Sequence, residues 1–297
     1  MPKIGQVNLG QVNLGQANPL SSDGMLSYCT PIEDYTSEYG LWVKREDLAC
    51  PPPGPPFSKT RGVFAHIVKI PSKAIGVLDT YHSQAGWAVA RACQVLGKRC
   101  INFYPEFKQE PGYREPQERA AELGAELVGL PAGRSAVLYH RAKAECAARH
   151  AYMMPNALKL HESVSETAGE VSTSPFASDA VIISASSGTI AAGVMRGYAA
   201  APGGLGDTLF IVHLGYTRSH ACVAKYLEDM AGNFPLREHR RNLLIVDEKY
   251  SYRDQARPGE TPPWPCNPYY DLKAFRWWLS ARTRYRKRET VLFWNVG

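Results

Sequence analysis

The chain is poor in the residues that cross-link small domains. Its seven cysteines are an odd number and include no C-x-x-C pair, which argues against both a disulfide framework and a zinc ribbon. The eight histidines show no H-E-x-x-H or comparable ligand spacing. We therefore expect reduced thiols and no metal site.

Long apolar runs are missing as well. The longest, such as 180–183 and 209–212, are far too short to span a bilayer, and the first residues show no basic segment followed by an apolar one. We expect a cytoplasmic protein with no membrane contact.

The chain does contain enough apolar residues for two packed lobes. Of its 297 residues, 44% are hydrophobic and 21% are charged, which is typical of a soluble globular protein. From residue 41 onward, short apolar runs alternate with helical patterns. The patterns predict strands at 41–44, 74–78, 99–104, 125–130, 180–184, 209–214, 243–246 and 291–294, and helices at 61–70, 86–96, 115–123, 135–149, 190–199 and 221–231. This alternation predicts an α/β fold with parallel sheets covered by helices on both faces.

The net charge of +6 is unevenly distributed. One basic cluster contains Arg237, Arg240 and Arg241. A second, the basic C-terminal segment, contains Arg276, Arg282, Arg284, Arg286, Lys287 and Arg288, interleaved with Trp277, Trp278 and Tyr285. Two interpretations are open. The segment either grips a nucleic acid through phosphate contacts and stacking, or forms a solvated basic helix whose aromatic face enters the core.

One lysine follows an unusually stiff loop. In residues 50–62, CPPPGPPFSKTRG, five prolines and a glycine precede Lys59 at the point where a helix begins. Ser58 is expected to cap that helix. A lysine held in this way could serve as a nucleophile whose position is fixed.

Residues 182–193, IISASSGTIAAG, are typical of a strand, a turn of small residues and a helix start. Small residues let backbone N–H groups converge, hydroxyls add donors, and the helix N-terminus adds positive potential, so the turn suits a phosphate. It lacks both the P-loop lysine and G-x-G-x-x-G, and a tight connection without a ligand is the alternative. A phosphate site combined with a positioned lysine points to pyridoxal phosphate, whose aldehyde forms a Schiff base with lysine.

Several short motifs occur in a familiar order. They are TPIEDYTSEYGLWVKREDL (30–48), FSKTRG (57–62), YHSQAGWAVARACQVLG (81–97), SASSGTIAAG (184–193) and NPYYDLKA (267–274). From about residue 30 onward the chain resembles the tryptophan-synthase-β-like, or fold type II, pyridoxal phosphate-dependent enzymes. It is most similar to the branch that holds 1-aminocyclopropane-1-carboxylate deaminase and D-cysteine desulfhydrase.

This resemblance implies a two-lobed α/β fold and a homodimer. Residues 1–28 would form an N-terminal arm with short repeats. Residues 29–70 and 166–297 would form a large domain that binds pyridoxal phosphate, and residues 71–165 would form a small α/β domain.

The resemblance also implies roles for individual residues that hold the cofactor. Lys59 takes the place of the Schiff-base lysine, and Gln84 that of an asparagine that bonds the phenolic oxygen. Asp271 stands where the deaminases carry an acidic partner for the pyridine nitrogen. Val296 replaces a threonine and has no hydroxyl, which leaves Asp271 as that partner. The phosphate loop is matched by Ser186, Ser187, Gly188 and Thr189.

Three functions are open. In the leading hypothesis the enzyme forms an external aldimine with an amino acid or amino-acid-like amine and performs deaminase or lyase chemistry at Cα, with Lys59 as base and Ser83 and Tyr270 in proton transfer or substrate contact. In the second, the substrate is an amino-acid-modified base in nucleic acid, as in phage-type DNA hypermodification by decarboxylation, and the basic C-terminal segment contacts the nucleic acid. In the third, the chain is a non-catalytic binding protein.

Overall fold

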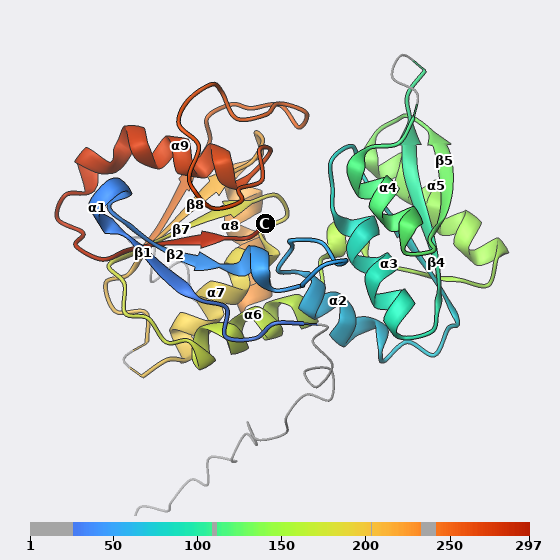
Figure 1. Ribbon diagram of the computed structural model, residues 1–297, viewed down its shortest axis with the longest axis horizontal. Helices are drawn as coiled ribbons and strands as arrows, with labels where there is room; N and C mark the ends of the chain where they lie inside the picture. Colours follow the sequence, from blue (N-terminus) through green and yellow to red (C-terminus); the bar gives the residue numbers. More distant parts are fainter. Residues whose placement is uncertain (1–25, 109–111, 203, 233–241) are drawn as a thin grey trace, which may run out of the picture.

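The computed structural model describes residues 26–108, 112–202, 204–232 and 242–297. The repeats of the predicted N-terminal arm and the cluster of Arg237, Arg240 and Arg241 lie outside these described residues. Figure 1 shows two lobes, each built around one sheet. Within the described ranges, no helix combines the length and the apolar character needed to cross a bilayer.

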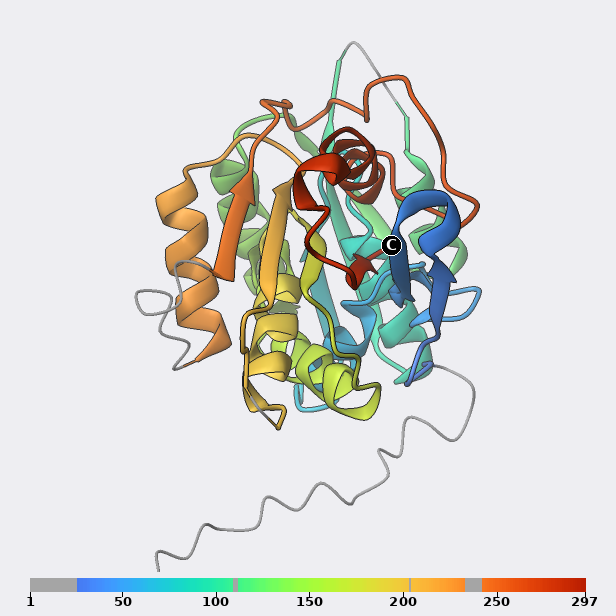
Figure 2. The ribbon, with the colours of Figure 1, turned by 90° about the vertical axis from the view of Figure 1, so that its left-hand side faces the viewer.

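The larger lobe contains a six-stranded sheet in the order β1-β2-β10-β7-β8-β9. Its strands are β1 (Ile32–Tyr35), β2 (Leu41–Arg45), β7 (Ala180–Ala185), β8 (Leu209–Leu214), β9 (Leu243–Val246) and β10 (Val291–Asn295). Neighbours are parallel except β1 and β2, which form an antiparallel pair joined by α1 (Thr36–Tyr39). Figure 2 shows the red strand β10 between the blue β2 and the yellow β7, so both ends of the sequence meet in one sheet.

Alternate residues of β7 enter two different cores, because successive strand side chains point to opposite faces. Val181 and Ile183 pack with residues of α6 (His161–Thr173), α7 (Thr189–Ala200) and α8 (His220–Ala231). Ala180 and Ile182 pack with residues of α9 (Asp271–Ala281). Both faces of the sheet are therefore covered by helices at β7, which fits the continuous apolar run of that strand.

The smaller lobe contains a four-stranded parallel sheet in the order β5-β4-β3-β6. Its strands are β3 (Ala74–Leu78), β4 (Arg99–Glu106), β5 (Glu126–Pro131) and β6 (Tyr152–Met153). Helices α3 (Ala85–Val95) and α4 (Glu115–Glu122) pack on one face, and α5 (Ser135–Ala148) packs on the other. Helix α2 (Thr60–Ile67) contacts both α3 and α6 and so joins the lobes. Short 3₁₀ turns lie at η2 (Glu46–Leu48), η3 (Asn156–Leu158) and η5 (Arg282–Tyr285).

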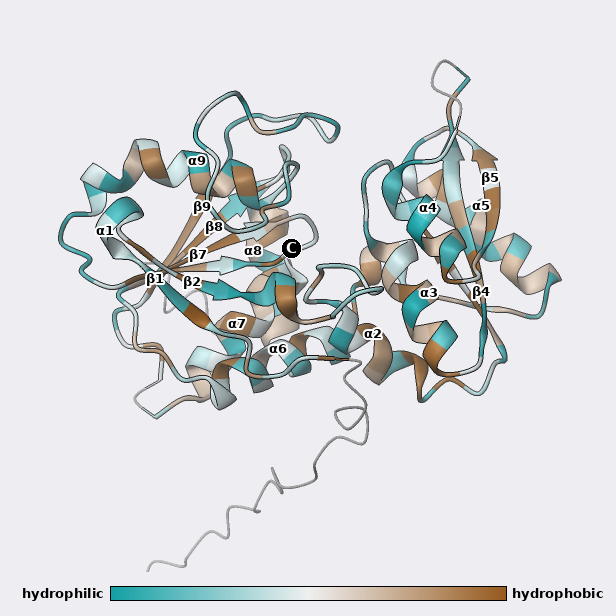
Figure 3. Ribbon diagram, viewed as in Figure 1, coloured by the Kyte–Doolittle hydropathy of each residue, from teal (hydrophilic) through white to brown (hydrophobic). Residues whose placement is uncertain are grey.

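All the predicted strands and helices are present, with ends shifted by a few residues. Figure 3 shows why the strands are easy to predict, since apolar residues are concentrated on β7, β8 and β5. Helix α6 is missed because it buries polar residues, among them Ser163, Thr167 and Glu170. This helix spans residue 165 and packs on α7 of the larger lobe, so it crosses a predicted domain boundary. The domain limits stay a prediction.

The expected cap at Ser58 is wrong. Helix α2 begins with Lys59 in the N-cap position, and no side chain caps it. The Ser58 backbone N–H instead donates to the Val296 carbonyl at 3.1 Å. The last strand of the sheet thus fixes the residue before Lys59.

The basic C-terminal segment runs through α9 and ends at the amino ends of β7 and β8. The Arg288 guanidinium donates to the backbone carbonyls of Asp179, just before β7, and of Asp207. Arg276 likewise donates to the Glu260 carbonyl, at 2.9 Å, and Trp278 is buried. These contacts favour the interpretation of a basic helix whose aromatic face enters the core.

Candidate active site

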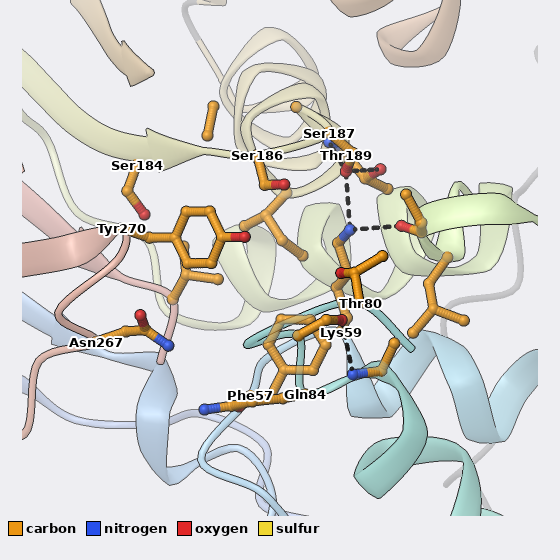
Figure 4. Close-up of a pocket in the computed structure, with 18 of the residues that line it drawn as sticks. Phe57, Lys59, Thr80, Gln84, Ser184, Ser186, Ser187, Thr189, Asn267 and Tyr270 are labelled. Carbon is orange, nitrogen blue, oxygen red and sulfur yellow. Dashed lines mark hydrogen bonds between the residues drawn. The ribbon is translucent and has the colours of Figure 1, made fainter. Parts of the chain in front are cut away.

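A cavity of about 390 Å³, the inner cavity, lies at the carboxyl ends of β7 and β10 and is lined by residues of both lobes. In open α/β sheets, ligands bind at this end of the strands. Lys59 enters it from the start of α2, Gln84 from the loop before α3, and Asp271 from the first turn of α9. Figure 4 shows the Lys59 amine directed toward Ser187 and Thr189.

The Lys59 amine is buried and held by two oxygens. Its Nζ atom lies 2.8 Å from Ser187 Oγ and 3.2 Å from the Ala157 carbonyl. Burial and, to a smaller extent, the nearby Lys159 lower the pKa of Lys59 to about 7. Because the charged form is disfavoured, a large fraction of this amine is neutral and nucleophilic near neutral pH.

The turn between β7 and α7 is built to receive an anion. Gly188 adopts a φ of +91°, which strains any residue with a Cβ atom, and it precedes the twelve-residue helix α7. The hydroxyls of Ser187 and Thr189 lie 2.9 Å apart, and Thr189 Oγ1 lies 2.9 Å from Tyr226 OH. The helix N-terminus and the hydroxyls together provide donors and positive potential for a phosphate.

Two basic residues lie beside this turn. Lys159 and Arg218 line the same cavity, and the Arg218 guanidinium donates to the Ser186 carbonyl. Neither belongs to a sequence pattern that predicts a site. They add positive charge on the side of the cavity where a phosphate would lie.

Asp271 is fully buried at another part of the cavity wall. Its Oδ1 atom accepts hydrogen bonds from Ser184 Oγ at 2.6 Å and from the Val296 backbone N–H at 3.2 Å, and its Oδ2 atom accepts one from the Gly297 N–H at 3.2 Å. Burial raises the pKa of Asp271 to about 7, although these hydrogen bonds oppose the shift. A protonated ring nitrogen next to Asp271 would stabilise the ionised form of its carboxyl group, which burial disfavours.

Gln84 has a buried side-chain oxygen, Oε1, with no hydrogen-bond partner among the described residues. Buried polar atoms are nearly always bonded, so an atom of this kind in a cavity indicates a missing ligand. The neighbouring Ser83 Oγ accepts the Ala85 N–H at 3.1 Å. Asp79 anchors the start of this loop by accepting the Thr80 N–H at 3.1 Å.

An aromatic wall closes the inner cavity near Tyr270. The Tyr270 hydroxyl lies 3.0 Å from His82 Nε2. The His82 ring lies between two tyrosine rings, with centroids 3.8 Å from Tyr269 and 4.6 Å from Tyr252. Burial lowers the pKa of His82 to about 3 and raises that of Tyr270 well above its ordinary value. This wall is therefore uncharged at neutral pH.

All the predicted site residues line this one cavity: Lys59, Ser83, Gln84, Ser186, Ser187, Gly188, Thr189, Tyr270 and Asp271. Their roles stay predictions. The sequence analysis assigns no role to further lining residues, namely Thr80, His82, Asn156, Lys159, Tyr216, Arg218, Tyr252 and Asn267. His82 and Asn267 lie within the quoted motifs, and most of the others stand alone in loops. Single loop residues carry no periodic signal by which they can be found.

The residues fit a cofactor that carries an aldehyde, a phosphate and a basic ring. A lysine with a pKa of about 7, an anion-binding turn, a buried carboxylate and an unpartnered amide line the same cavity. Together with the fold, they define the class of enzymes that use pyridoxal phosphate.

Comparison with known proteins agrees with this class. The family model described as "Pyridoxal-phosphate dependent enzyme" matches residues 26–229. The chain is also 48% identical over 282 residues to a protein of Pseudomonas phage M6 named "Glycyl-dTMP PLP-dependent decarboxylase", covering 90% of this chain and 98% of that one. The chain therefore belongs to the pyridoxal-phosphate dependent enzyme family, and its cofactor is pyridoxal phosphate.

Solved structures confirm the predicted fold. A homologue of 1-aminocyclopropane-1-carboxylate (ACC) deaminase superposes with a TM-score of 0.71 at 19% identity, covering 92% of this chain and 90% of that one. Threonine deaminase isoform 2 from Solanum lycopersicum gives a TM-score of 0.62 at 12% identity, covering 92% and 84%. At these identities the likeness shows the fold alone.

Proposed function

We propose that this enzyme is a decarboxylase that removes the carboxylate of a glycyl group carried on a thymidine nucleotide. The observation that carries the proposal is the 48% identity, over 90% of the chain, to the glycyl-dTMP decarboxylase. Deamination of an amino acid, the leading hypothesis from the sequence, is the alternative. Because the chain is a pyridoxal phosphate-dependent enzyme, the non-catalytic hypothesis is set aside.

The reaction breaks one carbon–carbon bond, releases carbon dioxide and places a proton on Cα. When bound, pyridoxal phosphate supplies an aldehyde that binds the substrate amine and a ring that accepts the electron pair left on Cα. The substrate must therefore carry a primary amine and a free carboxylate on the same carbon atom.

We assign the cofactor contacts to residues at separate parts of the cavity wall. Lys59 binds the aldehyde, Gln84 bonds the phenolic oxygen through its amide, and Asp271 holds the ring nitrogen. Ser186, Ser187, Gly188 and Thr189 hold the phosphate, with Lys159 and Arg218 close by. The place of Gln84 in the wall of the inner cavity and the anion-binding turn support this arrangement.

We assign proton transfer to Lys59 and Tyr270. With a pKa of about 7, the Lys59 amine exists in both protonation states near neutral pH, so its protonated form can deliver the proton that Cα takes up when carbon dioxide leaves. The raised pKa keeps the Tyr270 phenol protonated and able to donate. Ser83 lies on the adjoining loop and is assigned to substrate contact.

We place the substrate carboxylate against the uncharged wall around His82, a position in which decarboxylation is favoured over deamination. His82 lines the inner cavity but carries no positive charge at neutral pH, because its pKa is about 3. A carboxylate placed against neutral aromatic rings is less well stabilised than one paired with a cation, and carbon dioxide is neutral. The aromatic wall therefore assists cleavage of the bond between Cα and the carboxylate, because the negatively charged carboxylate becomes neutral carbon dioxide.

Product analysis tests the proposed function. Purified enzyme loaded with pyridoxal phosphate is incubated with glycyl-dTMP, and with glycine, alanine and threonine as controls. We expect carbon dioxide and an aminoalkyl nucleotide from glycyl-dTMP, and little turnover of the free amino acids. Release of ammonia from a free amino acid, without carbon dioxide, would support the deaminase alternative and contradict the proposal.

The predicted homodimer belongs to the same proposal and is tested by light scattering of the purified protein. The predicted nucleic-acid contact through the basic C-terminal segment gains no support from Arg276, Arg282 and Arg288, which donate to backbone carbonyls of the chain itself. Arg284, Arg286 and Lys287 of the same segment are exposed. Contacts with the nucleotide are better sought beside the inner cavity.

A further inference from the structure

A second cavity of about 690 Å³, the outer cavity, adjoins the inner one. Four residues line both cavities: His82, Gln84, Asn267 and Gly297. Sites for small organic ligands occupy roughly 300–1,000 Å³, so the inner cavity has room for the cofactor and a small amino-acid group but little more. A nucleotide joined to that group must extend beyond the inner cavity.

The outer cavity presents aromatic rings. Tyr81 and Tyr269 line it, and Tyr269 already stacks on His82 with an angle of 2° between the ring planes. A nucleobase stacks on tyrosine in the same way, and such contacts are typical where single bases are bound. The amide side chains of Gln255 and Asn267 line the same cavity and can read the polar edge of a base.

Two arginines lie next to these rings. The Arg114 guanidinium lies 4.8 Å from the centre of the Tyr81 ring and lines the outer cavity. The Arg253 guanidinium lies 4.6 Å from the Tyr81 ring and 4.0 Å from the Phe107 ring. Arg253 is exposed, and in the part of the chain that the structure describes its charge faces rings rather than a carboxylate. An arginine in this setting is available to a phosphate.

The acidic groups of the outer cavity have arginine partners other than Arg253. Asp47 is bound by the Arg45 guanidinium at 2.8 Å and by the Asn295 amide at 2.8 Å. Glu115, which is exposed at the start of α4, lies 3.9 Å from Arg119 Nε. The rim of the outer cavity therefore combines aromatic faces with positive charge.

We propose that the outer cavity is the subsite for the pyrimidine nucleotide of the substrate. The base stacks against Tyr269, the phosphate binds Arg253, and the amino-acid group passes Gln84 into the inner cavity. This inference rests on the proposed function. The nucleotide is either free or part of a DNA strand, and both sources share the same base and phosphate.

Binding measurements test the subsite without turnover. Cofactor-loaded enzyme is titrated by calorimetry with dTMP, thymidine, inorganic phosphate and a short thymidine oligonucleotide. We expect dTMP to bind at least tenfold more tightly than thymidine or inorganic phosphate, because base and phosphate are both recognised. Tighter, salt-dependent binding of the oligonucleotide identifies a DNA strand as the source, and tighter binding of dTMP identifies the free nucleotide. Equal, weak binding of all four probes overturns the subsite.

Arg253→Ala is the decisive variant, because Arg253 is exposed and its loss leaves the core intact. We expect the Kd for dTMP to rise about tenfold and most of the loss in kcat/KM to fall on KM. Arg257→Ala is the matched control. Arg257 is also exposed and lies 4.8 Å from a tyrosine ring, but that ring, Tyr250, does not line the outer cavity, whereas the Tyr81 ring beside Arg253 does. Equal dTMP affinity in the two variants contradicts the proposal.

The two proposals can fail separately. Binding of dTMP that depends on Arg253, without release of carbon dioxide from glycyl-dTMP, supports the subsite and contradicts the proposed function. Decarboxylation with a Kd for dTMP that Arg253→Ala leaves unchanged overturns the subsite alone.

Discussion

Lys59 Nζ lies 2.8 Å from Ser187 Oγ, although the two residues are 128 positions apart in the chain. Strand β10 lies between β2 and β7, and all three are parallel, so the segments that follow β2 and β7 leave the sheet at the same end of its strands. The contact places the amine that binds an aldehyde beside the turn that binds a phosphate. These are the two groups that one molecule of pyridoxal phosphate carries.

The pH dependence of cofactor capture tests the setting of Lys59. Only the neutral amine attacks an aldehyde, and burial lowers the pKa of Lys59 to about 7. Below that pKa, the capture rate of the cofactor-free enzyme should rise about tenfold per pH unit, and it should level off above about pH 8. Stopped-flow absorbance measures this rate.

Lys159 provides the control for that profile, because it lowers the pKa of Lys59 further. Lys159→Gln should move the midpoint to higher pH, whereas Lys159→Arg keeps the charge and should leave it in place. We compare the pH midpoint of the profile between variants and not the capture rate itself, since loss of Lys159 would also weaken phosphate binding and so change the rate. A midpoint near the ordinary pKa of lysine in the unmodified enzyme would contradict the account.

Gln84→Leu separates binding from stability. The Gln84 side-chain oxygen has no partner in the described protein, and an unsatisfied buried polar atom costs about 1–3 kcal/mol. The cofactor-free variant should therefore be at least as stable as the parent in urea, while its affinity for pyridoxal phosphate falls about tenfold. Gln117→Leu is the control, since the Gln117 amide donates to Asp79 at 2.8 Å and its loss should destabilise the protein. Unchanged cofactor affinity in Gln84→Leu would remove Gln84 from the site.

Asp271→Asn tests the partner of the ring nitrogen. The amide replaces Oδ2, which accepts the Gly297 N–H, by a donor, so about 1–3 kcal/mol of stability should be lost. Cofactor affinity, measured by spectroscopic titration, should fall by more than tenfold because the charge is removed. Asp179→Asn also loses an acceptor of backbone N–H groups, but at the opposite edge of the sheet, and should keep its affinity. Equal losses of affinity in both variants would point to a structural role.

Glu170→Gln tests the buried charges that hold the lobe together. Glu170 accepts Lys44 Nζ at 2.6 Å and lies 3.5 Å from Arg61, with all three side chains buried. Leaving these cations poorly paired should lower the free energy of unfolding by about 3–5 kcal/mol. Glu162→Gln, which alters partly exposed contacts with Lys69 and His66, should cost about 0–1 kcal/mol. Urea denaturation measures both, and similar values for the two variants would contradict the expected difference.

The sequence predicts the strands and the site better than it predicts the helices that bury polar groups. Val181 and Ile183 belong to a continuous apolar run, which is typical of a strand covered on both faces. Helix α6 carries no such signal, because Thr167 and Glu170 face the interior and satisfy their polar groups there. A pattern of apolar residues cannot reveal a helix that is held by buried charges.

Within the site, residues in motifs could be predicted and single loop residues could not. Lys59 and Ser187 belong to motifs that resemble a known family. Arg218 and Tyr252 line the same cavity, but each stands alone in a loop, and only the folded chain brings it there. The same holds for Arg253, whose position over Tyr81 depends on the packing of the two lobes.

Reductive trapping tests the central claim, that Lys59 binds the cofactor in this cavity. The enzyme is loaded with pyridoxal phosphate and reduced with borohydride, and its peptides are mapped by mass spectrometry beside Lys59→Ala and Lys159→Ala. The account predicts a pyridoxyl-phosphate group on the peptide that contains Lys59, retained in Lys159→Ala and lost in Lys59→Ala. A label on another lysine, or the same labelling in Lys59→Ala, would contradict it.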